Sequence, residues 1–189
     1  TFEMEGEFGL EEAMASAKRS YEVDILSDFK VIHLDPSVDP FGNPDIDEVL
    51  RRMFELLDFC VGVARTYGRQ IYFEVGTEET DGRLQDLKDF EYFLNSTRKF
   101  CEDRQYDLPV FAVGQTGTLV KETANVGAFQ SHFRPSGVMS AGLHIPWLVK
   151  VTESNGFMFK EHNADYLPDD VMEQHPKLGI HAANIAPQL

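Results

Sequence analysis

The stretch Phe29–Val75 decides the fold class. It opens with the β-prone run FKVIHL (Phe29–Leu34) and closes with a second such run, RQIYFEV (Arg69–Val75). Between the two runs, apolar residues recur with a period near 3.6, which predicts a helix that starts at Asn43-Pro44 and ends at Gly68. Two strands joined by a helix favour parallel pairing in one sheet.

The same alternation continues on both sides of this stretch. We expect three more strands, at Leu108–Val113, Phe157–Glu161 and Leu178–Ile185. The expected helices are Leu10–Ser27, the stretch from Leu84 to Cys101, Val138–Asn155 and Pro168–Gln174, and residues 114–137 read as a long loop. The sequence therefore predicts an α/β fold with a parallel sheet covered by helices, in a single domain over residues 1–189.

Composition narrows the class of protein. The chain has 189 residues, 15 of them Phe, and 32 acidic against 17 basic residues give it a net charge of −15. That charge repels phosphate backbones and anionic lipids, so we expect neither nucleic acid nor membrane as a partner. Cys60 and Cys101 both lie in helical patterns and are interpreted as buried free thiols of a cytoplasmic protein.

Ionisable and polar side chains gather where the predicted strands end. Because the carboxyl ends of parallel strands meet at one edge of a sheet, such residues are candidates for a binding or catalytic site. The segments concerned are His33–Ser37, Glu74–Glu78, Gly114–Gly117, Glu161–Asp165 and Asn184.

Strand periodicity assigns several of these side chains to one face of the sheet, opposite the large apolar residues. Glu74 is costly to bury without a partner, and Lys160 is predicted to pair with it or with Asp35, or to line a phosphate pocket. Structural interpretations remain open for each residue. Asp35 could cap a turn before Pro36, Glu74 could form a structural ion pair, and His162 could be a core histidine bonded to a carbonyl.

Three short motifs and the tail resemble one family. The segments are Ile32–Ser37 (IHLDPS), Val75–Glu78 (VGTE), Glu161–Tyr166 (EHNADY) and the tail Gly179–Leu189. In order and approximate spacing they are similar to the Z subunit of class II tagatose-bisphosphate aldolase. The resemblance implies a (β/α)8 TIM barrel of the class II aldolase superfamily, of which this chain supplies about the last five β/α units, strands 4 to 8.

The resemblance also implies roles for individual residues. Asp35 matches the aspartate that moves a proton in catalytic relatives, and Glu74 matches a glutamate there by strand position. His162 matches a histidine that binds zinc. Two departures affect these roles: Gln115 stands where catalytic members carry another zinc histidine, and Asn163-Ala164-Asp165 replaces their Gly-rich phosphate loop. The zinc ligand set in this chain is therefore incomplete.

The function expected from the resemblance is that of a carbohydrate-metabolism protein of the class II aldolase type, which binds or cleaves a ketose phosphate at the mouth of the barrel. Asp35 and Glu74 are its candidate catalytic residues, and His162 is a possible metal ligand. The candidate substrate-binding residues are His33, Ser37, Glu78, Gln115, Lys160, Asp165 and Asn184. Two alternatives remain: a non-catalytic subunit that binds and stabilises a catalytic aldolase partner, and an open doubly wound domain with an unrelated site. A homo-oligomer is also compatible with the sequence.

Overall fold

The computed structural model describes residues 9–39, 42, 44–77, 86–126 and 141–186. Helices and strands alternate along most of the chain, as the sequence predicts. The helices are α1 (Leu10–Leu26), α2 (Ile46–Thr66), α3 (Leu87–Arg104), α4 (Ala141–Ser154), α5 (Asp169–Met172) and α6 (His175–Leu178). The strands are β1 (Val31–Leu34), β2 (Tyr72–Gly76), β3 (Phe111–Gly114), β4 (Val120–Lys121), β5 (Ala124–Asn125), β6 (Met158–Glu161) and β7 (Ala182–Ala183).

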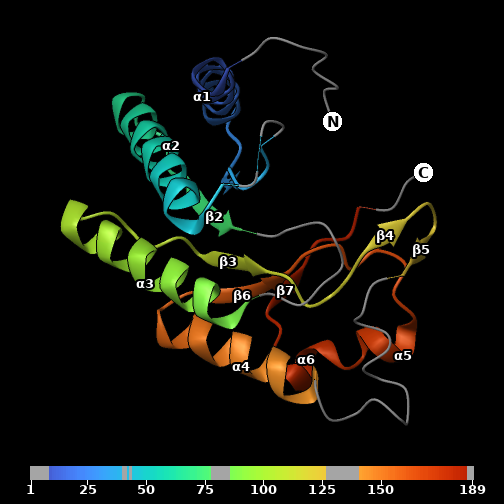
Figure 1. Cartoon of the computed structure of the whole chain (residues 1–189). Coiled ribbons are helices and arrows are strands. Elements are labelled where there is room, and N and C mark those ends of the chain that lie inside the picture. Colours follow the sequence, from blue (N-terminus) through green and yellow to red (C-terminus); the bar gives the residue numbers. More distant parts are fainter. Residues whose placement is uncertain (1–8, 40–41, 43, 78–85, 127–140, 187–189) are drawn as a thin grey trace.

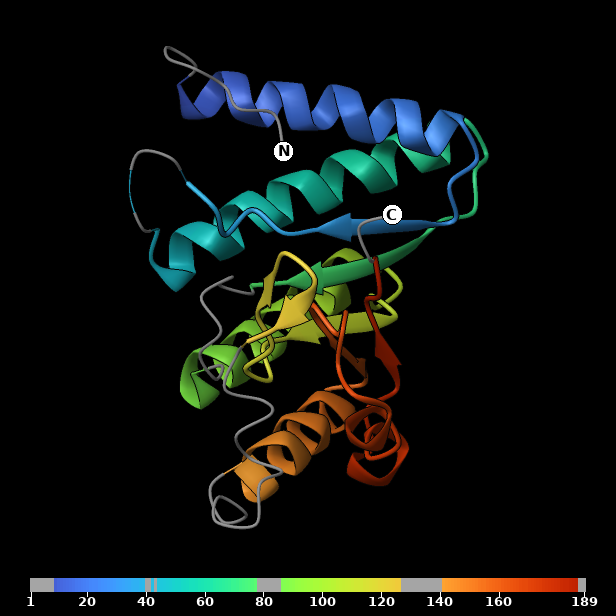
Figure 2. The same cartoon turned by 90° about the vertical axis from the view of Figure 1, so that its right-hand side faces the viewer.

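Five strands form one parallel sheet in the order β1-β2-β3-β6-β7, which is the order of the sequence. Helices α1, α2, α3 and α4 follow one another along the sheet, each packed on the next (Figures 1 and 2). A doubly wound sheet needs a point at which the strand order reverses. The described strands contain no such reversal, so the doubly wound alternative is wrong for this part of the chain.

Aspartate side chains fix where two helices begin. Asp45 accepts a hydrogen bond from the backbone N–H of Glu48 at the start of α2, and Asp86 accepts two at the start of α3. These bonds satisfy N–H groups that have no partner inside the helix. The predicted start of α2 at Asn43-Pro44 is therefore corrected to Asp45, two residues later.

Two other predictions on local structure need correction. A small antiparallel hairpin, β4–β5, lies inside the stretch predicted as a long loop. The last strand is shorter than predicted, because α6 occupies its first residue and Gly179 ends that helix at a φ of 79°. Positive φ suits glycine, which has no Cβ to collide with the backbone.

The core lies between the sheet and its helices. Residues that alternate toward the helices, such as Ile32, Val75 and Phe159, are almost fully buried. Cys60 and Cys101 are buried free thiols, as predicted, and burial raises the pKa of Cys60 to about 12. Among the described residues, no helix combines the length and the apolar character needed to cross a bilayer.

Gly114 allows two aromatic rings to approach the end of β3. A Cβ at this position would lie 2.7 Å from Phe159 Cε2 and 3.3 Å from Phe90 Cζ, and both rings are fully buried. Gly114→Ala is therefore expected to lower the free energy of unfolding by about 1–3 kcal/mol through overpacking. Urea denaturation measures this change. Gly62→Ala in α2 is the control: its Cβ would meet nothing within 4 Å, so it should stabilise the helix by up to about 1 kcal/mol. A loss at Gly62 as large as at Gly114 would contradict the overpacking argument.

Candidate functional site

The structure brings three of the predicted site residues together on the side of the sheet away from the helices. Glu74, in the middle of β2, is 4% exposed. Its Oε1 lies 2.8 Å from His33 Nδ1 on β1, and its Oε2 accepts a hydrogen bond of 2.5 Å from Lys160 Nζ on β6. The Lys160 ammonium also lies 5.8 Å from the centre of the Phe111 ring on β3. We call His33, Glu74 and Lys160 the charged cluster.

Electrostatics keep the carboxylate of the charged cluster ionised. Burial alone would raise the pKa of Glu74, but hydrogen bonds from His33 and Lys160 outweigh it and hold the pKa below its usual range. A lysine ammonium has three N–H donors, and Glu74 takes one of them. The cluster therefore offers a cation, supported by a fixed carboxylate, beside an imidazole.

Other predicted residues lie in the turns that follow the strands. Asp35 Oδ1 accepts a 2.9 Å hydrogen bond from the backbone N–H of Ser37, which is the turn-capping arrangement considered for Asp35. Gln115 directly follows β3 and is 4% exposed. Glu78 lies outside the described residues.

The segment after β6 is held mainly by backbone and amide contacts. His162 is half-buried, with Nδ1 3.2 Å from Asn163 Nδ2, and its carbonyl accepts a hydrogen bond from Thr118 Oγ1. Asp165 is buried and accepts from the backbone N–H of Ala186. Asn184 uses its backbone, which bonds Glu161 and Ala164, each at 3.0 Å. These contacts fix the shape of the segment, and they place Asp165 and the backbone of Asn184 in supporting positions.

A second charged pair, formed by Glu161 and His175, lies at the end of β6. Glu161 belongs to one of the predicted segments, but neither residue is among the candidate catalytic, substrate-binding or metal residues. Glu161 ends β6 with its side chain toward the helices and has no exposed surface. It contacts His175 Nε2 and accepts a 2.5 Å hydrogen bond from Thr116 Oγ1. Strand alternation contained a usable signal, because it places Glu161 on the same face as Phe159, where a carboxylate requires a partner. It contained no indication that the partner is His175.

The described residues do not fit a zinc site. No three of their His, Cys, Asp or Glu side chains gather in a metal-binding arrangement. In the charged cluster, the Lys160 ammonium lies against Glu74 and repels a divalent cation there. The metal-ligand role of His162 therefore stays an implication of the resemblance.

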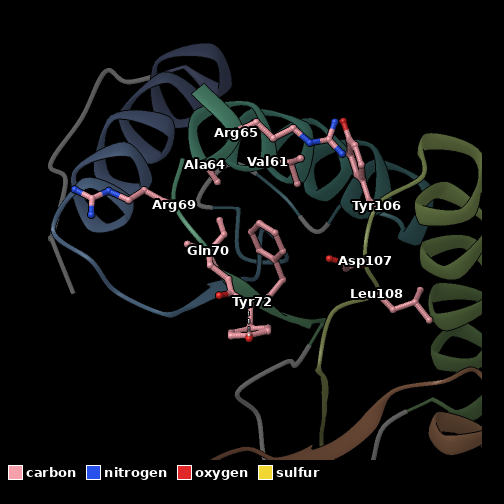
Figure 3. Close-up of a pocket in the computed structure, with 11 residues that line it drawn as sticks. Val61, Ala64, Arg65, Arg69, Gln70, Tyr72, Tyr106, Asp107 and Leu108 are labelled. Atoms are coloured by element: carbon pink, nitrogen blue, oxygen red, sulfur yellow. Dashed lines mark hydrogen bonds between the residues drawn. The ribbon is translucent and has the colours of Figure 1, made fainter. Parts of the chain in front are cut away.

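A cavity of about 260 Å3 lies beside the amino end of β2, with Tyr72 and Phe73 in its lining (Figure 3). Its walls come from α2, the α2–β2 turn and the segment before β3, where Arg65 stacks on Tyr106 with 4.9 Å between the guanidinium carbon and the ring centre. The lining is more apolar than polar, and none of the predicted site residues belongs to it. The charged cluster and this cavity therefore share no residue.

The arrangement of helices and strands is similar to that of a known structure. A probable tagatose 6 phosphate kinase from Sinorhizobium meliloti 1021 aligns with a TM-score of 0.70 and 16% identity, over 95% of this chain and 43% of that protein. At this identity the likeness shows the fold, and the chain spans less than half of the kinase's length.

Two further structures align less well. A putative phosphonomutase from Burkholderia cenocepacia J2315 has a TM-score of 0.47 and 13% identity, over 90% of this chain and 57% of that protein. The YdjI aldolase from Escherichia coli K12 has a TM-score of 0.42 and 16% identity, over 84% and 44%. Scores this low add nothing to the fold argument. No protein-family model and no curated protein sequence matches the chain.

Proposed function

We propose that this chain is part of a carbohydrate-metabolism protein of the class II aldolase type and binds a ketose phosphate at the carboxyl ends of its parallel strands. The observation that carries the proposal is the charged cluster, in which Glu74 fixes Lys160 and His33 beside one another. A phosphate needs a cation with available N–H donors, and sugar hydroxyls pair with imidazole, amide and carboxylate groups.

The consecutive order of the parallel strands supports a barrel as the setting of this site. A sheet that winds in one direction, with its helices packed in sequence, is the arrangement from which a (β/α)8 barrel is built. In such barrels the site lies at the carboxyl ends of the strands. One solved structure with this fold is a probable tagatose 6 phosphate kinase, and that activity agrees with a sugar phosphate as ligand.

Ligand titration by calorimetry tests the proposal. The native chain is expected to bind fructose 1,6-bisphosphate or tagatose 1,6-bisphosphate, and Lys160→Met should weaken binding about tenfold or more, because a hydrogen bond to a charged group contributes about 1.5–3 kcal/mol. Lys160→Arg keeps the charge and should retain part of the affinity. Lys18→Met is the control, since Lys18 forms a more exposed pair with Glu55 elsewhere. Absence of binding by the native chain, or native affinity in Lys160→Met, would overturn the proposal.

One observation favours a second candidate, the non-catalytic subunit. Both oxygens of Glu74 already have partners, and the described residues gather no three metal ligands, so the chemistry of a zinc aldolase lacks its centre in this part of the chain. Such a subunit is expected to form a stable complex with a catalytic class II aldolase and to lengthen the half-life of its activity. Retro-aldol turnover by the chain alone would contradict this second candidate.

A further inference from the structure

Glu161 is a fully buried carboxylate that joins three separate segments. Its Oε1 accepts from Thr116, which follows β3, and its Oε2 contacts His175 in α6. Glu161 itself ends β6, one residue before His162. Isolated ionised carboxylates are too costly to bury, so the contacts to Thr116 and His175 are what allow Glu161 to remain in this position.

The contacts of His175 determine how many protons it carries. Its Nδ1 lies 3.3 Å from the carbonyl oxygen of Val171, and a carbonyl can only accept, so Nδ1 holds a proton. Its Nε2 faces the Glu161 carboxylate, which accepts when ionised. When Glu161 is ionised, both ring nitrogens donate and the ring is an imidazolium. Burial alone would lower the pKa of His175, but Glu161 and the carbonyls of Val171 and Met172 outweigh it and raise the pKa above its ordinary value.

The segment that follows Glu161 has an unusual backbone that its neighbours hold in place. Asn163 and Tyr166 have φ angles of 54° and 57°, in the left-handed region that non-glycine residues rarely adopt. Asn125 Nδ2 donates to the carbonyls of Asn163 and Asp165, at 2.9 and 3.1 Å. Such conformations persist only where surrounding contacts enforce them, and they cluster at functional sites.

We infer that Thr116, Glu161 and His175 form a buried charged clamp whose imidazolium–carboxylate pair positions residues 162–166 for ligand binding at the carboxyl ends of the strands. The three are positioning residues, since they act through the segment they hold. This inference rests on the proposed function for the identity of the ligand. The clamp itself rests on the contacts of the three side chains.

Two NMR measurements test the clamp without any ligand. In native protein, the ring nitrogens of His175 are expected to show the imidazolium pattern at pH 7, above the ordinary pKa of 6.5. In His175→Gln, which keeps an N–H donor but loses the charge, exchange protection of the Ala164 amide is expected to fall about tenfold. That amide donates to the Asn184 carbonyl and reports on the segment. A neutral His175 ring at pH 7, or unchanged protection of Ala164, would overturn the clamp.

Ligand titration then tests what the clamp does. The affinity of His175→Gln for fructose 1,6-bisphosphate is expected to be about tenfold below that of native protein at pH 7. The affinity of native protein should decline as rising pH deprotonates His175, and the affinity of His175→Gln should show no such decline. His181→Gln is the matched control, because His181 pairs with exposed Glu153 at 3.3 Å. A Gln side-chain oxygen can still accept from the backbone N–H of Phe159, which bonds His181 Nδ1 at 3.1 Å, so affinity and pH profile should stay unchanged. Native affinity and profile in His175→Gln would refute the positioning role. If native protein binds no ketose phosphate, the proposed function fails, and the clamp is judged by the two NMR results alone.

Discussion

Glu161→Leu is expected to lower the free energy of unfolding by about 3–5 kcal/mol at pH 6, because it removes the carboxylate that stabilises the charge of the buried His175. The direction in which the free energy of unfolding changes with pH should also reverse. In native protein the raised pKa of His175 contributes stability that is complete below 6.5 and is lost as pH rises through the folded value. In the variant, burial lowers the pKa of His175, so stability should rise with pH toward 6.5. Urea denaturation between pH 5 and 9 measures both effects.

An exposed pair of the same chemistry provides the control for Glu161→Leu. Glu153 lies 3.3 Å from His181 and its side chain is 55% exposed. Glu153→Leu should change stability by no more than about 0.5 kcal/mol, because solvent and salt screen such pairs. A loss below about 1 kcal/mol in Glu161→Leu, with a native pH profile, would show that the buried pair is not ionised.

Lys160→Met is expected to lower the free energy of unfolding by about 3 kcal/mol at pH 7, because it breaks a buried ion pair. The loss should lie at the lower end for such a change, since His33 still contacts Glu74. The lowered pKa of Glu74 contributes stability that is present above its ordinary value of 4.5 and is lost as pH falls through the folded value. Without Lys160 that folded pKa rises, since burial is less opposed. The difference between variant and native protein should therefore be full at pH 7 and shrink as pH falls through the folded pKa of Glu74 in the variant toward that in native protein.

A double variant and a control make the Lys160 result specific. Replacing both partners, in Lys160→Met with Glu74→Leu, should recover much of the loss, because no unpaired charge then stays buried. Lys18→Met should reduce stability by no more than about 1 kcal/mol, since its pair with Glu55 at 2.6 Å is partly exposed. An equal loss at Lys18 and Lys160 would show that burial of Glu74 has no energetic role.

Much of the fold could be predicted from the sequence, because local patterns carry it. Apolar periodicity indicated the approximate bounds of helices α1, α3 and α4, and of strands β1, β2, β3 and β6. The errors fall where local signals compete. Asn43-Pro44 and Asp45 both offer the start of α2, and the structure uses Asp45, whose side chain reaches the N–H of Glu48.

The candidate site was predicted less completely. The pairing of Lys160 with Glu74 was foreseen as one of three options, because a carboxylate on a buried strand requires a cation. The pairing of Glu161 with His175 was missed. These residues are 14 apart, and the backbone between them passes through two left-handed residues and a short helix that no period describes.

The sequence by itself determined the long helices and the approximate positions of the five strands of the main sheet, that these strands run parallel, and that polar groups gather at their carboxyl ends. Each of these follows from neighbours within a few positions along the chain. Only the tertiary structure decided which charges meet. A pair such as Glu74 and Lys160, 86 residues apart, depends on strand order and register, and these are set by how the whole sheet packs on its helices.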